Sequence, residues 1–386
     1  MPPDSSGSID DDDDDVGGGA RGDQNQGDCN DAGRRADDDS DAAAGSSSSS
    51  PAPAALARQS LARQLLGVPH AALISVTFGL FLASFPMGAF VVFASGIGGD
   101  INYDLPLTHL SLFEGTGLHL APAPASVGDA FAILWLGYLV AFATACMGPA
   151  RGFMGAMSDV MAGRRTAHRF DNYMLGIITW FSILVLASIV ITSAQGYAGI
   201  ETVPPESEND LVEFFYVTLA PIVEETGFRL VLVGIPVFLM YSGRFSLRYV
   251  ARCLWRPDAV GVDDHRRALA VIVAVGLLFG FAHIALGEPW SEGKFAQAAA
   301  GGIILGWVYV RYGFVASVLV HWATNYFIFS HAHFISQTHL VTLEEAFSHS
   351  MMLSVEVILA VCGILSVAAI VTSSKTAGPL RRDRPA

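Results

Sequence analysis

Two adjacent carboxylates and an arginine stand inside a strongly apolar run of the chain. Glu224, Glu225 and Arg229 lie within residues 211–241, a stretch otherwise long and apolar enough to cross a membrane. Insertion scales place the cost of each such side chain at a bilayer centre at about 2.5 to 3.5 kcal/mol, so the three charges need compensation. Ionisable residues inside a membrane usually serve a function, which makes this stretch the first candidate site.

The spacing of the three charges predicts that they divide into a pair and a single group. Glu225 and Arg229 are four residues apart with the carboxylate first, which is the favourable order for an ion pair on one helix face. Glu224 lies about 100° further round the helix and cannot share that geometry equally well. We therefore expect Glu224 to remain free, as a desolvated carboxylate that could act as a general base. The alternative is a buried polar network that only fixes helix packing.

Two later apolar stretches each carry polar side chains. His283 ends one of them, and His321 and Asn325, four residues apart on one helix face, lie within another. Each has a structural interpretation when taken alone, such as a core histidine or an asparagine bonded to a neighbouring helix. Together with Glu224 they form a set suited to hydrolysis, in which the carboxylate takes a proton from water and the amide and a histidine donate to an oxyanion.

The same residues also suit a metal. Glu224, His283 and His321 could bind a zinc ion with water as the fourth ligand, an arrangement found in several metallopeptidases. Zinc is the one cofactor that the sequence suggests.

A second cluster of titratable residues occupies the stretch 331–350. Its irregular spacing favours an interfacial loop over a metal site. The residues are His331, His333, His339, Glu344, Glu345 and His349.

The whole chain reads as a membrane protein. Of its 386 residues 52% are hydrophobic and only 15% are charged, far fewer charges than a soluble protein of this length carries. A helix of about 20 apolar residues spans a bilayer, and most of eight apolar segments reach that length. These segments lie near residues 71–98, 130–149, 173–195, 211–241, 268–286, 296–310, 314–332 and 351–372.

The charges of the loops predict an orientation. Loops 99–129, 196–210 and 331–350 contain no lysine or arginine, whereas loop 242–267 contains six arginines. Because cytoplasmic loops carry the excess of basic residues, the alternation predicts a multi-pass protein of the cell membrane with eight spans and both termini in the cytoplasm. The arginine-rich loop is explained by this topology and by anionic lipid, and no nucleic-acid-binding motif is present.

The chain divides into four predicted regions. Residues 1–50 hold 14 aspartates and three arginines among Gly and Ser runs, a composition that cannot bury enough apolar area to fold. We expect a disordered, acidic cytoplasmic tail over 1–57, with a short surface helix near 54–68 leading into the membrane. Three spans follow over 58–210, a core with four spans over 211–332, and a last loop, span and basic tail over 333–386.

Three motifs in this order resemble a known family. They are Glu224-Glu225-x-x-x-Arg229, Phe279-x-x-x-His283 and His321-x-x-x-Asn325. On separate predicted spans between about 211 and 330, they look like the motifs of the CPBP intramembrane proteases, the CAAX-protease and bacteriocin-processing (Abi) family related to the type II CAAX prenyl endopeptidase. The resemblance implies an all-helical bundle of about eight spans around an intramembrane cavity, and endopeptidase cleavage of a membrane-tethered protein.

The resemblance also implies a role for each motif residue. Glu224 and His283 would activate the water, His321 with Asn325 would stabilise the oxyanion, and the paired charges would support the site. Versions of this chemistry with and without a metal use the same residues. The expected partners are the lipid bilayer and a membrane-anchored protein or peptide substrate.

Two other classes of function remain open from the sequence. The same carboxylates and histidines could relay protons in a proton-coupled transporter. The chain could also be a non-catalytic membrane scaffold or immunity protein. No HExxH, GxSxG or P-loop motif supports a soluble zincin, a serine hydrolase or a nucleotide-driven protein.

Overall fold

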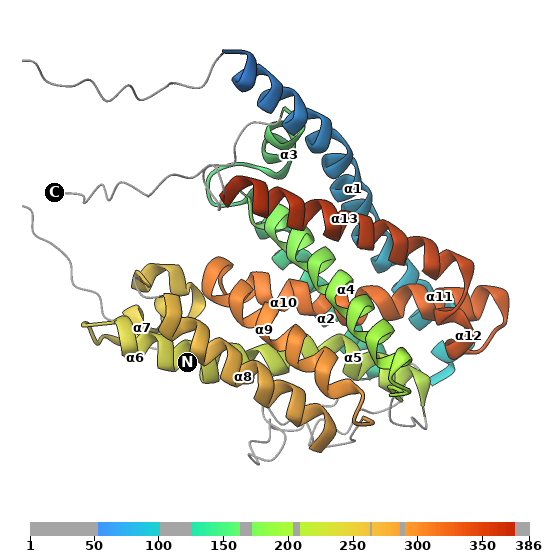
Figure 1. The fold of residues 1–386 in the computed structure, drawn as a ribbon. Coiled ribbons are helices and arrows are strands. Elements are labelled where there is room, and N and C mark those ends of the chain that lie inside the picture. Colours follow the sequence, from blue (N-terminus) through green and yellow to red (C-terminus); the bar gives the residue numbers. More distant parts are fainter. Residues whose placement is uncertain are drawn as a thin grey trace, which may run out of the picture. The chain divides into compact units, whose positions relative to one another are not determined.

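A computed structural model describes most of the chain after the acidic tail, and the chain folds as helices (Figure 1). The described residues are 53–100, 126–162, 172–203, 209–262, 265–285 and 290–374. The α-helices are α1 (Pro53–Ala94), α2 (Val127–Met147), α3 (Phe153–Met161), α4 (Tyr173–Tyr197), α5 (Asp210–Glu224), α6 (Ile235–Tyr241), α7 (Leu247–Trp255), α8 (His265–Ala285), α9 (Lys294–Tyr312), α10 (Phe314–Trp322), α11 (Ile328–His339), α12 (Leu343–Phe347) and α13 (Ser350–Ser374).

The first helix is longer than the sequence predicts. The surface helix expected near 54–68 is continuous with the first apolar segment in α1, which runs through Pro69 and Pro86. Prolines inside a membrane helix are tolerated where neighbouring groups satisfy the freed backbone. Residues 1–52 of the predicted disordered tail 1–57 lie outside the described residues. The last five residues of that tail belong to α1.

Five helices are long and apolar enough to cross a membrane, which indicates a multi-pass membrane protein. They are Leu66–Ala94, Val127–Met147, Tyr173–Tyr197, His265–Ala285 and Ser350–Thr372. The other three predicted segments, 211–241, 296–310 and 314–332, are also helical but are not among these candidate spans.

Two of those three segments are interrupted by π-helical turns. Residues Glu225–Gly234 join α5 to α6, and Ala323–Phe327 join α10 to α11, so each segment is one helical rod over 210–241 or 314–339. π-Turns are rare in proteins, and those that are present often lie at functional sites. Both of these turns contain motif residues.

The helical rod 314–339 corrects the loop predicted at 331–350. α11 continues to His339, and His331 and His333 are buried in it rather than lying in an interfacial loop. The His333 ring packs against Phe214 of α5, with ring centroids 5.0 Å apart. Burial of aromatic surface on this helix therefore outweighs the polarity that suggested a loop.

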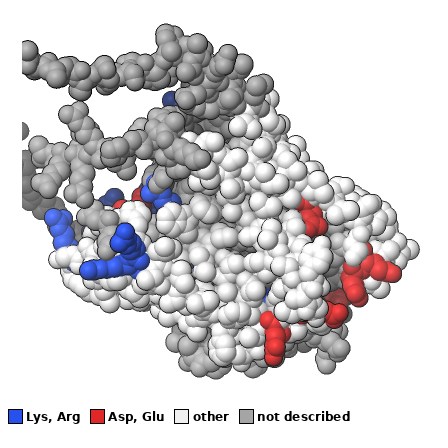
Figure 2. Space-filling view, in the orientation of Figure 1, with Lys and Arg blue, Asp and Glu red and all other residues white. Residues whose placement is uncertain are grey.

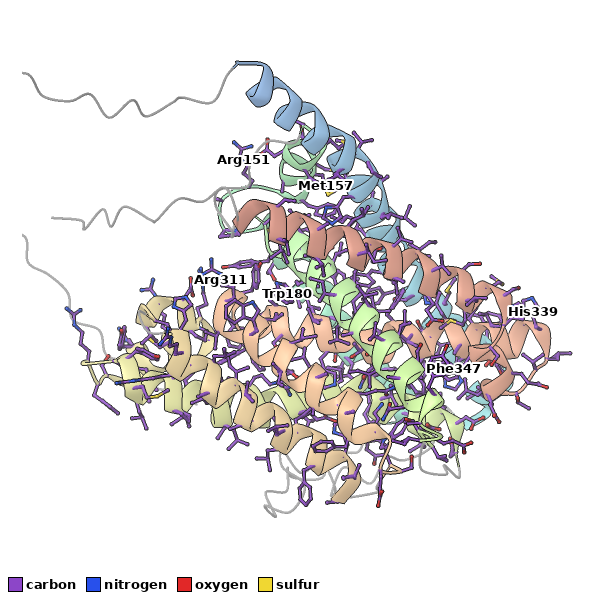
Figure 3. All side chains as sticks on the ribbon, viewed as in Figure 1. Arg151, Met157, Trp180, Arg311, His339 and Phe347 are labelled. Carbon is purple, nitrogen blue, oxygen red and sulfur yellow. The ribbon has the colours of Figure 1, made fainter. Side chains whose placement is uncertain are left out.

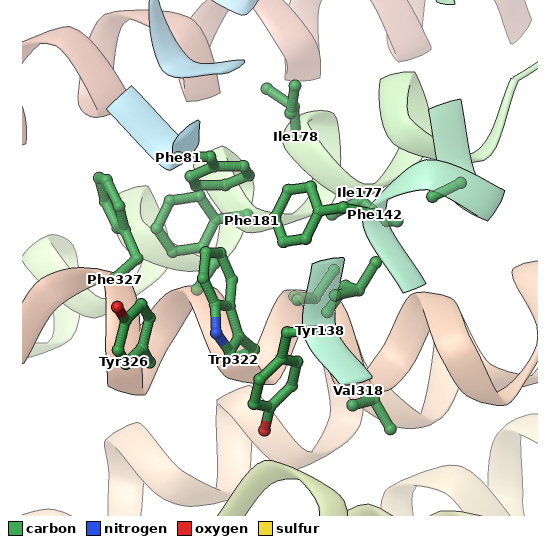
Figure 4. Close-up of a cluster of buried hydrophobic side chains, with 14 of the residues drawn as sticks. Phe81, Tyr138, Phe142, Ile177, Ile178, Phe181, Val318, Trp322, Tyr326 and Phe327 are labelled. Carbon is green, nitrogen blue, oxygen red and sulfur yellow. The ribbon is translucent and has the colours of Figure 1, made fainter. Parts of the chain in front are cut away.

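An aromatic cluster fixes the helices that surround the candidate site (Figure 4). Phe81 of α1 and Phe142 of α2 meet Trp322 of α10 edge-on, with centroids 5.7 and 4.8 Å apart. Phe181 of α4 lies edge-on to Phe327, at 5.7 Å. Edge-to-face pairs of this kind stabilise by about 0.5 to 1.5 kcal/mol beyond burial alone, so Trp322 holds its neighbour in sequence, His321, at a fixed position.

Glycines bring α8 and α9 into close contact. Gly276 and Gly280 lie four residues apart on α8, and a Cβ atom on Gly302 of α9 would approach the Gly276 Cα to 2.9 Å. Small residues at this spacing let helix backbones approach closely inside a membrane. α9 also packs against α4 and α10, so α8 is tied through α9 to the rest of the bundle.

Basic and acidic side chains gather at opposite ends of the described bundle (Figure 2). Arginines lie near α6 and α7, where Arg248 and Arg252 belong to α7. Aspartates and glutamates lie near α11 and α12, where Glu344 and Glu345 form the first turn of α12. We call these the basic end and the acidic end.

Candidate active site

Glu225 is the centre of a buried polar network. Its Oε1 atom lies 3.0 Å from Nη1 of Arg229 and 2.8 Å from Nδ1 of His321, and its Oε2 accepts a hydrogen bond from Ser317. Glu225 and Arg229 are both fully buried. The predicted ion pair is present, and the same carboxylate also binds α10, which the sequence did not indicate.

Arg229 is compensated from three sides. Besides Glu225, its Nη2 donates to the carbonyl oxygen of Gly302 at 3.4 Å, and its guanidinium carbon lies 4.2 Å from the centroid of the Phe279 ring. A cation over an aromatic face is stabilised by the ring quadrupole, most strongly where water is excluded. The close packing of α8 and α9 therefore brings together the partners that this buried charge needs.

The contact between Glu225 and His321 fixes which nitrogen of the imidazole faces the second carboxylate. Because Nδ1 of His321 donates to Glu225, its Nε2 is the nitrogen that lies 3.7 Å from Oε2 of Glu224. That separation is too long for a direct hydrogen bond. The Glu224 side chain is 29% exposed, and its Oε2 has no hydrogen-bond partner among the described residues. Glu224 is thus the free carboxylate, as its position on the helix predicted.

His283 lies in the last turn of α8 with one nitrogen engaged. Nδ1 lies 2.9 Å from the carbonyl oxygen of Phe279 and donates to it, which leaves the lone pair of Nε2 available. The Phe279 ring packs edge-on against both His283 and His321, with centroids 4.6 and 6.0 Å apart. Phe279 therefore positions both imidazoles as well as covering Arg229.

Asn325 lies in the π-helical turn that follows His321. Its Nδ2 donates to the carbonyl oxygen of Val217 at 3.4 Å, and its Oδ1 accepts from Thr324 at 3.3 Å. Nδ2 carries two hydrogens, so one donor remains for a further acceptor.

The motif residues meet beside one cavity of about 440 Å³, bounded by α4, α8, α9, α10, the turn 323–327 and α13. His283, His321 and Asn325 line it. Glu224 is not among the lining residues and reaches the site through its proximity to His321. The remaining wall is mainly apolar, with Phe181, Leu305 and Leu359 among its residues.

The exposed part of the cavity lining lies toward the acidic end. Thr192 and Ser193 belong to the last two turns of α4, Phe347 to α12, and Glu356 to the first two turns of α13 (Figure 3, where Phe347 is labelled). All four side chains are exposed. The cavity therefore has its mouth where these helix ends meet.

The predicted zinc ligands are not gathered closely enough to bind a metal as they stand. No three His, Cys, Asp or Glu side chains within the described ranges form a group that could hold a metal ion. Glu224 and His321 are neighbours, but His283 does not complete a set with them. The stretch 331–350, all of it described, supplies no alternative group. Nδ1 of His331 lies 2.8 Å from the carbonyl oxygen of Phe327, and the tilted rings of His339 and His349 have centroids 4.7 Å apart.

Two polar groups at the site were not predicted from the sequence. Ser317 precedes His321 by four residues, so helical spacing alone places both on the face that meets Glu225. Lys294 lines the cavity and is the single lysine or arginine in the loop between the predicted apolar segments 268–286 and 296–310. A lone cation in a loop otherwise free of basic residues was the available signal.

Comparison with known proteins agrees with the motifs. Residues 210–327 match the family model described as "Type II CAAX prenyl endopeptidase Rce1-like", and all three motifs fall inside this range. No curated protein and no solved structure matches the chain. Residues 210–327 are therefore a domain of the Rce1-like type II CAAX prenyl endopeptidase (CPBP) family.

Proposed function

We propose that the protein is an intramembrane endopeptidase that hydrolyses a peptide bond of a membrane-tethered protein. The observation that carries this proposal is the free Oε2 of Glu224, 3.7 Å from Nε2 of His321 and beside a cavity that also presents His283 and Asn325. Membership of residues 210–327 in a prenyl endopeptidase family supports peptidase chemistry.

In the proposed first step, a water molecule attacks the carbonyl carbon of the substrate. Glu224 takes one proton from the water. The lone pair on Nε2 of His283 accepts a hydrogen bond from the other O–H group of the water and so orients the water. A C–O bond forms and the carbonyl oxygen becomes an oxyanion. The two carboxylates have different roles because their surroundings differ. Glu225 is hydrogen-bonded to His321 and Ser317, whereas Oε2 of Glu224 has no hydrogen-bond partner among the described residues and can accept a proton.

The oxyanion would be stabilised by Asn325 and His321. Asn325 has a spare hydrogen on Nδ2, and His321 can donate from Nε2 while Nδ1 donates to Glu225 when both nitrogens carry protons. In the second step the C–N bond breaks, and the proton held by Glu224 passes to the leaving amine.

A zinc-assisted version of this reaction would use Glu224, His283 and His321 as ligands. These three side chains do not form a metal-holding group as they are placed, so every step above is assigned to the side chains themselves. Metal analysis of active protein, followed by chelation and metal addition, tests whether a metal takes part.

We further propose an eight-span topology in the cell membrane with both termini in the cytoplasm. The five candidate spans, the helical rods 210–241 and 314–339, and residues 296–310 of α9 would together make eight crossings. The separation of basic and acidic ends supports this orientation, because basic residues concentrate on the cytoplasmic side. The cavity mouth would then face the opposite side. Reporters fused at each terminus and in loop 340–349 test the orientation.

The proposed function is tested with purified protein in lipid vesicles. Wild-type protein should cleave a membrane-anchored peptide, and Glu224→Gln should lose this activity while its folding is unchanged. Substrate-dependent proton flux without peptide hydrolysis would instead indicate the proton-coupled transporter.

A further inference from the structure

One charged side chain in the cavity is not accounted for by the proposed reaction. Lys294, the first residue of α9, lines the same cavity as His283, His321 and Asn325. It is the only lysine or arginine among the described lining residues.

The surroundings of Lys294 leave its charge poorly compensated. Its ammonium lies 4.0 Å from the centroid of the Trp290 ring, a cation–π contact. Glu224 attracts it through space, although no ion pair joins the two among the described residues. A cation held in a largely apolar cavity is costly unless an anion joins it.

The start of α9 adds to the positive potential at this position. Gly293 is the N-cap residue and supplies no side-chain cap, and the N–H groups of Lys294 and Phe295 donate instead to the carbonyl oxygens of Ser291 and Glu292. The positive end of the helix dipole and the lysine therefore act in the same direction.

The carboxylates of the site have other neighbours. Glu225 is engaged by Arg229 at 3.0 Å, and Glu224 lies 3.7 Å from His321. Among the described residues, Lys294 is therefore a cation in the cavity that no carboxylate contacts, next to the position where a substrate would lie.

We propose that Lys294 is a specificity-determining residue that binds a carboxylate of the substrate chain inside the cavity. The carboxylate has two possible sources, the C-terminal group of the substrate or an Asp or Glu side chain close to the cleaved bond. Because Lys294 and Glu224 lie within electrostatic reach of one another, this carboxylate lies within a few residues of the bond that is cleaved. The inference rests on the proposed peptidase function.

The test uses lipid-anchored peptides in vesicles of phosphatidylcholine and phosphatidylglycerol. In the first set the terminal residues are randomised, and each sequence is made in two forms, one with a free C-terminal carboxylate and one with a C-terminal carboxamide. A second set ends in carboxamide and carries Asp or Asn at successive positions. Binding to wild-type protein is measured by fluorescence anisotropy and cleavage by mass spectrometry, so each peptide gives two readings.

We expect wild-type protein to bind and cleave carboxylate-bearing peptides at least about tenfold better than their neutral partners, which is the size of one charge-assisted hydrogen bond. Lys294→Gln should remove the difference, and Lys294→Arg should retain it. Arg248→Gln, an exposed residue of α7 at the basic end, is the matched control and should behave as wild type. The set that shows the preference identifies the source of the carboxylate.

The outcomes separate the two proposals. Equal binding and cleavage of charged and neutral peptides by wild-type protein would overturn the role of Lys294 and leave the peptidase function standing. A Lys294-dependent binding preference without any cleavage would support the carboxylate site and count against the peptidase. Equal losses for charged and neutral peptides in Lys294→Gln would show that Lys294 only compensates Glu224.

Discussion

Nδ1 of His321 lies 2.8 Å from Oε1 of Glu225, and this contact joins the first and third motifs of the chain through a single buried carboxylate. The same oxygen receives Arg229 at 3.0 Å. Glu225 therefore orients the imidazole that faces Glu224, and its role in the site is positional.

Replacing Glu225 by glutamine should destabilise the protein by about 3 to 5 kcal/mol, because Arg229 would be left as an unpaired buried charge. The measurement is unfolding of the purified variant in detergent micelles. The double variant Glu225→Gln/Arg229→Met should regain much of this stability but little activity, since His321 would still lack its carboxylate. A single variant as stable as wild type would contradict the account of this pair.

Two neighbouring glycines of α9 provide a matched pair for the packing of α8 and α9. A Cβ atom at Gly302 would meet the Gly276 Cα at 2.9 Å, whereas one at Gly301 would meet nothing within 4 Å. Gly302→Ala should therefore lower both stability and activity. Gly301→Ala should be neutral or stabilise by up to about 1 kcal/mol, because alanine favours the helix. Because Gly301 lines the cavity, the two variants are compared by thermal unfolding, and equal stability would argue against close packing at Gly302.

Asn325→Ala should lower kcat by about 10²- to 10³-fold and change KM little, as expected for loss of one oxyanion donor. Thr324→Ala is a useful comparison, because the Thr324 hydroxyl donates to the His321 carbonyl oxygen and to Oδ1 of Asn325 and is not a proposed oxyanion donor, so its loss should cost less. Steady-state kinetics on a membrane-anchored peptide give both constants. A rise in KM with unchanged kcat would assign Asn325 to substrate binding instead.

The preference for carboxylate-bearing peptides should depend on pH. Lys294 lies ahead of the predicted span 296–310, and burial lowers its pKa to about 8 against the opposing attraction of Glu224. A lysine is charged below its pKa, so the preference should be full below about pH 7 and fade as pH rises through 8. Glu224 and His283 face this lysine, and Glu356 of α13 lines the same cavity.

The quantity to measure is the ratio of carboxylate to carboxamide cleavage. Titration of the catalytic groups affects both peptides and cancels in this ratio. A ratio that stays constant from pH 6 to pH 9.5 would contradict the assignment to Lys294.

The sequence predicted those features of the site that depend on spacing along one helix. The Glu225–Arg229 pair and the freedom of Glu224 both follow from positions on a helical face, and both are present. The helical fold followed from apolar segment lengths. Segments that contain charges or π-turns, such as 210–241, differ from simple apolar helices and are not among the five helices that length and composition identify as candidate spans.

What the sequence could not predict depends on contacts between helices. The hydrogen bonds from Ser317 and His321 to Glu225 require α10 to lie against the turn 225–234, which no local pattern specifies. Burial of His333 depends likewise on the aromatic surface of α5, so its polar neighbours in sequence suggested a loop. Lys294 was a single residue without a motif, and only its place in the cavity gives it significance.

Cleavage of a membrane-anchored peptide by the Glu224→Gln variant tests the central claim most directly. Glutamine preserves the size of the side chain but cannot take a proton from water, and loss of a general base typically costs about 10²- to 10⁴-fold. The control is Glu344→Gln, an exposed residue of α12, which should cleave at the wild-type rate. The account predicts that Glu224→Gln, with unchanged thermal unfolding, loses at least about 10²-fold in rate, and turnover at the wild-type rate would contradict it.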